Sequence, residues 1–350
     1  METNCVKIGN IEISDNKKVL IVAELGVTHN GSVAEAKQLM KAAVEAGMDI
    51  IKCEMFVADR LVGDRNMIYK TMTNQGPYEK NYYQLLKDLE FSKEELIELK
   101  RYADELNIPF FGTCFDFEEI DFAVENGFDA IKFSSGEITH YPLLQYGAKT
   151  GLPIFIDTGG SLLFEVEKAV MTVRNEGNEN VIIMHNPSGY PAVPERTNLR
   201  MIQSIKNICN KPVGLSCHTP GRDAVIAAVA IGANAIEKPL TLDKNYYGDE
   251  HIFSLQIDEF KEYVEAIRFI EKAMGKNERF LDEFEEAIRK AGRQSLIAAI
   301  DLKEGDILSL ENTRFARPNK GIIPEHIDIA IGRKIRQNIG KNEFITWGHV

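Results

Sequence analysis

The sequence lacks long hydrophobic runs, a basic excess and paired cysteines, and each absence excludes a class of protein. No apolar stretch in its 350 residues reaches the roughly 18–20 residues that cross a bilayer. Residues 1–18 lack the apolar segment of a secretion signal. The net charge is −12, and without a basic stripe a nucleic-acid partner is not expected. We therefore expect a cytoplasmic protein with no membrane partner.

The cysteines are odd in number and form no C-x-x-C motif. They are Cys5, Cys53, Cys114, Cys209 and Cys217. Such a set is typical of reduced, buried thiols in the cytoplasm. Cys217 remains open as a reactive group, because it precedes His218 at the end of a predicted strand.

Eight short apolar runs, each ending in polar residues, are the main pattern in the chain. They occupy residues 19–25, 49–55, 108–114, 129–137, 152–158, 180–185, 212–218 and 234–239. Helical patterns separate them at 32–47, 92–107, 117–126, 141–150, 161–175, 196–208, 221–231 and 257–274. Runs of this kind suit strands that are covered on both faces.

Eight alternations of strand and helix predict an α/β fold of the (β/α)8 TIM-barrel type, with a leading hairpin near 6–19. A doubly wound open sheet is the alternative, but its usual glycine-rich first turn is missing. In a barrel, the polar residues that end the strands gather at one rim. We therefore expect an active site at that rim.

Two regions depart from the alternation. Residues 57–90 are far longer than a usual βα loop, and we interpret them as a substrate-covering segment, with a plain insertion as the alternative. The barrel is predicted over 1–275. A charged linker follows at 276–290, and a small β-rich domain with turn signals KEGD and GKNE is predicted at 291–350.

Several motifs resemble one known family in order along nearly the whole chain. They are IVAELGVTHNGSVAEAKQLMKAAVEAGMDIIK, KFSSGEITHYPLL, IDTGG, SGYP, VGLSCHT, IEKPLTLD and FSLQIDEF. They resemble the N-acetylneuraminate (sialic acid) synthase family, which includes legionaminate and pseudaminate synthases and a spore-coat polysaccharide protein. The tail, RFARPNKGI followed by IGRKI, resembles that family's antifreeze-like (SAF) domain.

The resemblance implies a transferase of polysaccharide biosynthesis. Phosphoenolpyruvate condenses with the open-chain aldehyde of an N-acylated amino sugar, giving a nonulosonic acid and phosphate. The resemblance also implies a domain-swapped homodimer, in which each C-terminal domain covers the partner's barrel.

Five residues match family positions that contact phosphoenolpyruvate. Lys52 and Lys132 are compact cations suited to its carboxylate and phosphate. Thr113, Ser135 and Ser216 supply short hydroxyl donors at the ends of the third, fourth and seventh strands. The resemblance makes the two lysines part of the catalytic set.

Three other residues match positions that hold the amino sugar. Glu24 and Tyr190 match sugar-contacting positions in the barrel, and Glu24 also belongs to the expected catalytic set. Arg317, in ARPNKG, matches the arginine that grips the N-acyl group from the partner subunit. Glu137 and His251 are weaker candidates at the rim, which we interpret as structural.

The family polarises the aldehyde with a divalent metal, such as Mn²⁺ or Mg²⁺, held by two histidines. His218 matches the first and joins the catalytic set, but Pro239 stands at the second. Because proline has no ligand atom in its side chain, the two-histidine site is broken. A rearranged metal site of Glu54, Asp157, His185 and His218 is an alternative.

Four more departures fall on ligand-contacting positions. Thr28 and Ser188 each replace asparagine, and Glu54 replaces glutamine, so a possible donor becomes an acceptor-only carboxylate. Asp157 replaces a phosphate-contacting serine. Like charges about 4 Å apart repel by about 4 kcal/mol at an effective dielectric near 20. Asp157 must therefore turn away, be protonated or be paired with a cation, or phosphoenolpyruvate is not the ligand.

The leading hypothesis is a phosphoenolpyruvate-dependent synthase of a sialic-acid-like sugar acid, with N-acetylmannosamine not assumed as acceptor. One alternative is a lyase or aldolase, in which Lys52, Lys132 or Lys238 forms a Schiff base after burial lowers its pKa. Another is a sugar-binding paralogue that kept the fold and lost the metal.

Overall fold

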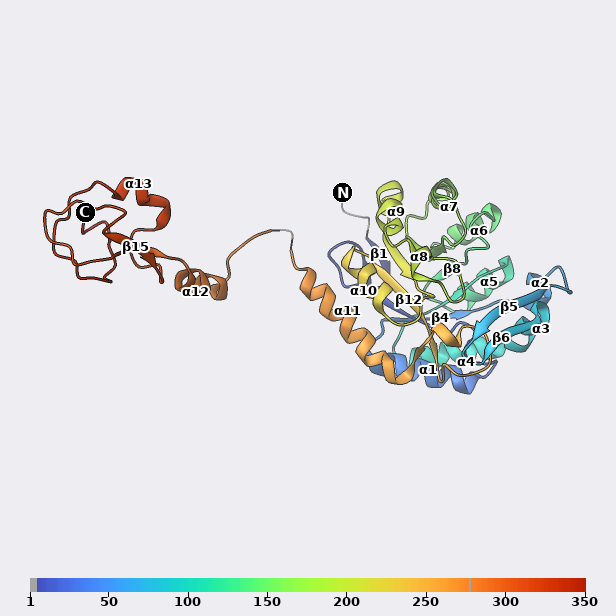
Figure 1. Ribbon diagram of the computed structural model, residues 1–350. Helices are drawn as coiled ribbons and strands as arrows, with labels where there is room; N and C mark the ends of the chain where they lie inside the picture. The colour runs from blue at the N-terminus through green and yellow to red at the C-terminus, as the bar shows by residue number, and fades with distance from the viewer. Residues whose placement is uncertain (1–4, 277) are drawn as a thin grey trace. The chain divides into compact units, whose positions relative to one another are not determined.

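The computed structural model describes residues 5–276 and 278–350, and it divides into two compact units, residues 1–275 and 276–350. Figure 1 shows the course of the chain in each unit. No helix within the described ranges is long and apolar enough to cross a membrane.

The first unit is built on a closed parallel barrel (Figure 1). Within the described residues its eight strands are β3 (Leu20–Glu24), β4 (Ile50–Glu54), β7 (Phe110–Thr113), β8 (Ile131–Phe133), β9 (Ile154–Asp157), β10 (Val181–His185), β11 (Val213–Ser216) and β12 (Ala235–Thr241). They pair in this order, and β12 closes the ring by pairing with both β11 and β3. The predicted barrel and all eight of its strands are confirmed.

The helices pack outside this ring. They are α1 (Val33–Ala46), α4 (Lys93–Glu105), α5 (Phe117–Glu125), α6 (Tyr141–Lys149), α7 (Leu163–Asn175), α9 (Met201–Cys209), α10 (Asp223–Ala230) and α11 (Phe260–Met274). A capping box of Ser92 and Glu95 begins α4. The single helix predicted at 196–208 is wrong. A short α8 (Pro194–Thr197) ends where Asn198 adopts a left-handed φ of 45°, and α9 begins after it.

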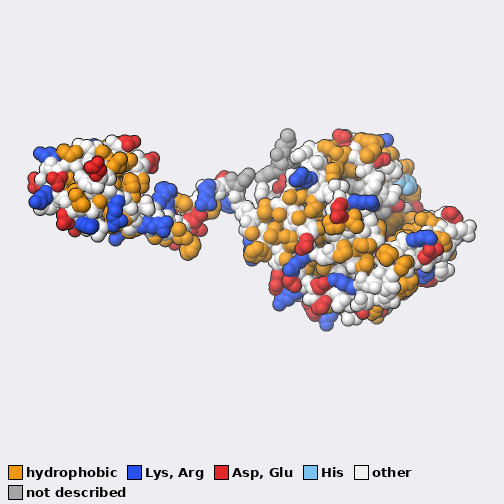
Figure 2. All heavy atoms as spheres, viewed as in Figure 1, with side chains coloured by type: hydrophobic (Ala, Val, Ile, Leu, Met, Phe, Trp, Pro, Cys, Tyr) orange, Lys and Arg blue, Asp and Glu red, His pale blue; other side chains and the backbone are white. Residues whose placement is uncertain are grey.

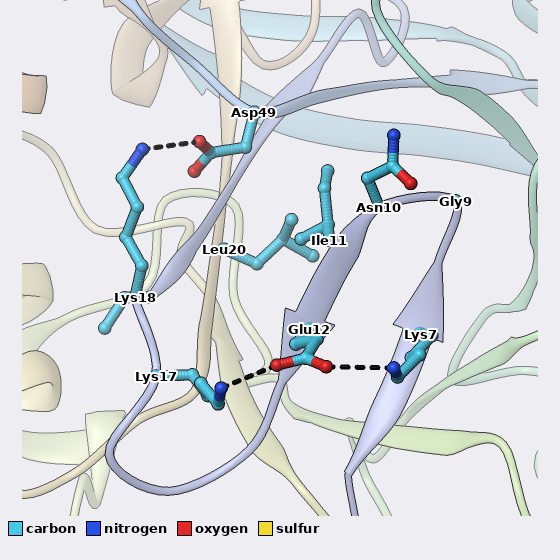
Figure 3. Close-up of a pocket in the computed structure, with 10 residues that line it drawn as sticks. Lys7, Gly9, Asn10, Ile11, Glu12, Lys17, Lys18, Leu20 and Asp49 are labelled. Carbon is cyan, nitrogen blue, oxygen red and sulfur yellow. Dashed lines mark hydrogen bonds and ion pairs between the residues drawn. The ribbon is translucent and has the colours of Figure 1, made fainter.

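The predicted hairpin closes the amino-terminal end of the barrel. Its strands are β1 (Val6–Ile8) and β2 (Ile11–Ile13), and its buried side chains join one cluster with strand residues such as Leu20 and Ile50. On its outer side, a cavity of about 470 Å³ has Glu12 between Lys7 and Lys17, at 2.9 and 2.6 Å (Figure 3). The polar residues that end the barrel strands therefore lie at the other end of the barrel from this hairpin.

The segment 57–90 is structured. It contains α2 (Ala58–Leu61), β5 (Ile68–Thr73), β6 (Gly76–Asn81) and α3 (Tyr82–Leu89), and β5 and β6 form an antiparallel hairpin. The hairpin is tied to loops that follow barrel strands. The Thr71 hydroxyl donates to the Tyr190 carbonyl at 2.8 Å, and the Asn74 amide donates to the Lys244 carbonyl at 2.8 Å. These contacts hold the segment over the rim of the barrel.

The loop after β12 holds three short elements before α11. They are the 3-10 turns η1 (His251–Phe253) and η2 (Ile257–Glu259) and the strand β13 (Leu255–Gln256). This loop brings Asp249 and Glu250 to the rim.

The second unit begins with α12 (Glu283–Gly292), within and just beyond the predicted linker. Strands β14 (Ser295–Ala298) and β15 (Thr313–Ala316) pair antiparallel, and η3 (Pro324–His326) and α13 (Ile327–Ala330) follow. A separate apolar core includes Leu302 and Ile339. The described part of this unit has little regular strand, because much of its backbone forms turns and isolated bridges.

Candidate active site

A cavity of about 400 Å³ opens at the carboxyl ends of the barrel strands, within the size range of small-molecule sites. Most of the residues predicted for the site line it. They are Glu24, Lys52, Glu54, Thr113, Ser135, Asp157, Tyr190, Ser216 and His218. The structure therefore gathers residues from seven strands or their following loops into one place.

Lys52 lies between two carboxylates on the cavity floor. Its Nζ is 2.5 Å from Glu24 Oε1 and also contacts Glu54. Lys52 and Glu54 point the same way because strand side chains repeat with a period of two. Burial opposes the charged form of Lys52, but Glu24 and Glu54 outweigh it and raise the lysine pKa well above its usual value. Lys52 is therefore a fixed ammonium.

Lys132 forms the second fixed cation. Its Nζ lies 2.9 Å from Asp157 Oδ2 and contacts Glu237. Burial again opposes the charge, and Asp157 and Glu237 outweigh it, so the pKa of Lys132 is raised. Glu237 is fully buried and also lies 3.9 Å from Lys52 Nζ, which links the two lysines.

Several buried polar atoms of the cavity have no hydrogen-bond partner. Among the described residues they are Glu24 Oε2, Glu54 Oε2, Thr113 Oγ1, Asp157 Oδ1, His218 Nδ1 and Glu237 Oε2. Buried polar groups in folded proteins are nearly always paired, so unpaired ones require an explanation. Their concentration here indicates a place for a polar ligand.

The carboxyl groups on the cavity floor have pKa values that are shifted in different directions. Burial raises the pKa of Asp157 to about 7, despite Lys132, and burial also raises the pKa of Glu54. For Glu24, burial acts in the same direction, but Lys52 and Lys132 outweigh it and lower the pKa. The floor therefore gains negative charge as the pH rises through neutrality.

His218 is a neutral imidazole at physiological pH. Burial and the nearby Lys132 lower its pKa to about 3. Its ring packs 4.6 Å from the ring of Tyr190 and 5.4 Å from that of Phe253, centroid to centroid. Its Nδ1 is buried without a hydrogen-bond partner.

A resident metal does not fit these residues. Within the described residues, no group of three or more histidine, cysteine or acidic side chains is arranged to hold a metal ion. His185 Nε2 lies 2.8 Å from the Thr197 carbonyl, so the rearranged site with Glu54 and Asp157 is wrong. Pro239 stands opposite Glu24 in the β12–β3 register and adds no ligand.

Comparison with known proteins agrees with this geometry. The NeuB family model matches residues 39–279, and the SAF domain model matches residues 293–350. The chain belongs to the NeuB family.

Several relatives of this NeuB-family protein are named as sugar-acid synthases. It is 36% identical over 334 residues to N,N'-diacetyllegionaminic acid synthase of Legionella pneumophila, with 94% of each chain covered. It is 34% identical over 336 residues to pseudaminic acid synthase of Campylobacter jejuni, with 95% of this chain and 96% of that one covered. The crystal structure of N-acetylneuraminic acid synthetase from Leptospira borgpetersenii, in complex with citrate, is similar with a TM-score of 0.74. It is 29% identical and covers 82% of this chain and 95% of that one.

The lysines of this NeuB-family protein are poor Schiff-base formers. Imine formation needs a neutral amine, whereas Lys52 and Lys132 have raised pKa values. The pKa of Lys238 is lowered by burial, but its Nζ donates to the Thr219 carbonyl and does not line the cavity. Cys217 is also buried, with its Sγ 3.1 Å from the Thr219 hydroxyl, and it has no access to the cavity either.

Some predicted residues lie elsewhere. Ser188 is exposed and does not line the cavity. Arg317 is exposed on the second unit, just after β15. Thr28 is buried, and its hydroxyl donates to the Leu25 carbonyl at 2.8 Å, which is a structural role. His251 Nδ1 lies 2.7 Å from the Thr241 hydroxyl, as expected for a structural residue.

Sequence reasoning missed several residues that line the cavity. Glu237 lies within a recognised strand, β12, and is a rare charged residue in an apolar run, which could have selected it. Tyr69 and Tyr82 come from the insertion, and Asp249 and Glu250 come from the loop after β12. Glu250 has a φ of 67°, which non-glycine residues rarely adopt, and no sequence signal indicates that backbone.

Proposed function

We propose that this NeuB-family protein condenses phosphoenolpyruvate with the open-chain aldehyde of an N-acylated amino sugar. The products are a sialic-acid-like nonulosonic acid and phosphate. The observation that carries the proposal is a pair of buried ammonium groups beside unpartnered polar atoms: Lys52 lines the cavity, and Lys132 contacts the lining residues Asp157 and Glu237. The proposal also rests on relatives that are named as synthases of such acids.

The residues of the floor suit the donor. Lys52 and Lys132 are point charges for its carboxylate and phosphate, and the Thr113 hydroxyl has a free hydrogen-bonding capacity. Ser135 and Ser216 line the same cavity with further hydroxyls. Holding the donor by several fixed groups fixes the orientation of its enol carbon, which lowers the entropic part of the barrier.

The reaction follows from that orientation. The enol carbon attacks the aldehyde carbon, and the aldehyde oxygen takes up a proton. Water then adds to the cationic carbon that carries the phosphate oxygen, and cleavage of that carbon–oxygen bond releases phosphate and leaves a keto acid. We propose that His218 orients the aldehyde through its unpartnered Nδ1.

Binding of the donor requires a change of charge on the floor. Asp157 occupies one contact of Lys132, and an ionised Asp157 would repel a phosphate. Because the pKa of Asp157 is about 7, the carboxyl takes up a proton at little cost near neutral pH. Protonation would leave Lys132 free to pair with the phosphate.

We further propose that the protein acts as a homodimer in the cytoplasm, where its free cysteines stay reduced. Phe280, Phe284 and Ile288 are exposed to 63%, 74% and 56%, on and just before α12. The spacing of four places Phe284 and Ile288 on one face of α12. Figure 2 shows hydrophobic side chains on the surface of this part of the chain. A second copy is the partner we expect, and its Arg317 would reach the N-acyl group of the acceptor.

The test is phosphate release from phosphoenolpyruvate across a panel of N-acylated amino sugars, with mass spectrometry of the product. We expect one or more acceptors to give a sugar acid and one phosphate each. Lys132→Met abolishes release, whereas Lys211→Met does not, because Lys211 is equally buried but contacts Glu179 outside the cavity. Silence of the wild type across the panel, without donor binding, contradicts the proposal.

A further inference from the structure

Lys238 is a buried lysine on β12 that does not reach the cavity. It is 1% exposed, and it follows Glu237, which lines the cavity. Successive side chains of a strand point to opposite faces. Ile236 and Leu240, two positions to either side of Lys238, belong to the apolar cluster that the strands share with the surrounding helices. Lys238 therefore points into the layer between the barrel and its helices.

The same alternation applies to the residues around His218. Strand β11 ends at Ser216, and both Ser216 and His218 line the cavity. Cys217, between them, belongs to the same apolar cluster outside the ring of strands. Thr219 is buried and does not line the cavity. The imidazole thus faces the cavity, while the residues before and after it face the outer layer in which Lys238 lies.

Lys238 contacts both of these flanking residues. Its Nζ donates to the Thr219 carbonyl, and it lies 3.7 Å from Cys217 Sγ. Cys217 Sγ is in turn 3.1 Å from the Thr219 hydroxyl oxygen. The Cys217 backbone N–H donates to the Glu237 carbonyl at 2.9 Å. One side chain of β12 therefore joins the residue before His218 to the residue after it.

A structural role alone does not account for an amine at this position. Burial of an ammonium group has a high cost unless the group is paired with an opposite charge. Within the described residues the hydrogen-bond partners of Lys238 Nζ are a carbonyl and a thiol, and no carboxylate forms an ion pair with it. An apolar side chain would fill the space at a lower cost. Local features that lower stability in this way are expected at functional sites.

The ring of His218 depends on this support. Its Nδ1 has no hydrogen-bond partner. The ring packs against Tyr190 and Phe253, and the His218 carbonyl accepts from the Ala192 N–H at 3.1 Å. Because Nδ1 has no partner of its own, its position depends on these contacts and on the turn formed by residues 217–219.

We infer that Lys238 is a positioning residue, which fixes the imidazole of His218 by holding residues 217–219 from outside the barrel. This inference rests on the proposed function, in which His218 orients the aldehyde. Lys238 touches neither substrate. A misplacement of about 1 Å at a reacting group can slow a reaction by about 100-fold, so a small movement of the turn is enough to affect catalysis.

The experiment compares variants of the full-length protein with phosphoenolpyruvate and an amino sugar that the wild type accepts. Methionine at position 238 has a similar length but cannot donate to the Thr219 carbonyl. For Lys238→Met we expect kcat to fall by about 10- to 100-fold. The dissociation constant for phosphoenolpyruvate, measured by calorimetry, should not change. Lys238→Gln, which keeps an N–H donor, should recover part of the lost kcat.

Lys211→Met is the matched control. Lys211 is also 1% exposed, and its Nζ also donates to a carbonyl, that of Glu179, at 2.7 Å. Neither residue lines the cavity. Lys211→Met should therefore lower the free energy of unfolding and leave kcat unchanged.

A second measurement follows the imidazole itself and does not need turnover. The NMR signal of isotope-labelled His218, assigned by its loss in His218→Gln, reports the environment of the ring. We expect Lys238→Met to shift and broaden this signal and Lys211→Met to leave it unchanged. If Lys238→Met does not fold, Cys217→Ala removes the sulfur contact of Lys238 and should change kcat and the signal in the same direction, by less.

The outcomes separate this inference from the proposed function. An unchanged kcat in Lys238→Met, or a loss of kcat that Lys211→Met matches, overturns the inference while the synthase activity stands. A loss of kcat without a change in the His218 signal also overturns it, because Lys238 would then act by another route. Absence of phosphate release by the wild type with every acceptor contradicts the proposed function. In that case the His218 signal alone decides whether Lys238 positions the ring.

Discussion

Asp157 Oδ2 lies 2.9 Å from Lys132 Nζ, while the second carboxylate oxygen of Asp157 is buried without a partner. The carboxylate thus occupies a contact of the cation that we assign to the donor. The sequence left several arrangements open for Asp157, and the structure shows the one in which its carboxylate pairs with a cation, Lys132.

This pairing predicts that donor affinity falls as the pH rises. The pKa of Asp157 is raised to about 7, so the carboxyl is neutral below that pH and repels phosphate above it. We expect the dissociation constant for phosphoenolpyruvate to increase several-fold between pH 6.5 and 8, measured by calorimetry. Asp157→Asn lacks the ionisable group and should show only the dependence that comes from the ligand's own phosphate. Parallel pH profiles for the two proteins contradict this role.

The unpartnered hydroxyl of Thr113 predicts opposite effects on stability and binding. Thr113→Val removes a buried group that has no partner in the free protein, so we expect the free energy of unfolding to stay equal or rise. Donor affinity should fall about fivefold, as one hydrogen bond of about 1 kcal/mol is lost. Thr197→Val is the control. Its buried hydroxyl donates to the Val193 carbonyl at 3.0 Å, so stability falls and donor affinity does not change.

The misfit of a metal predicts insensitivity to chelators. Pro239 stands at the second of the two histidine positions, and no other cluster of metal-binding side chains is present among the described residues. We therefore expect the rate of phosphate release to remain within about twofold after dialysis against EDTA. Added Mn²⁺ should not restore or increase it. A loss of activity that Mn²⁺ reverses would show that the acceptor or donor completes a metal site.

Buried His29 predicts a loss of stability in acid. Burial lowers its pKa to about 4, against an ordinary value of 6.5, so the unfolded chain binds the proton more readily than the folded one. Stability is therefore lost as the pH falls from 6.5 toward 4, by about 2 kcal/mol from this residue at pH 5. Denaturant unfolding at pH 7 and pH 5 should show a smaller difference for His29→Gln. An unchanged difference argues against a neutral His29.

The apolar face of α12 predicts the oligomeric state. Phe284 is 74% exposed, and a charge at its position would be buried in a dimer interface at high cost. We expect the wild type to sediment as a dimer and Phe284→Asp as a monomer, measured by analytical ultracentrifugation. Glu286→Gln, two positions away on the same helix and therefore on a different face, should remain dimeric.

The barrel and most of its site could be predicted because they depend on local patterns. A buried strand is an apolar run, and its polar end residue lies at a known rim, so Lys52, Lys132 and Asp157 are visible in the sequence. Glu237 was not selected, because its importance comes from its approach to lysines more than 100 positions away. The break at Asn198 depends on one left-handed residue within a helical pattern. Ser188 lies outside the cavity because its loop, and not a strand, sets its direction.

The segment 57–90 shows the same limit of prediction from the sequence. Its length indicated a covering segment, but Leu86 and Phe56 meet only after residues 57–90 fold onto the rim. Tyr69, Asp249 and Glu250 come from separate loops whose contacts no periodic pattern encodes.

The amino-terminal hairpin also has a chemical consequence. Val6, Ile8 and Ile13 fill the base of the barrel with hydrocarbon, so solvent has no polar route to the floor from below. In the reaction that we propose, the water molecule must therefore enter from the same side as the sugar. A firmly seated acceptor would regulate hydration of the short-lived cation and limit wasteful hydrolysis of the donor.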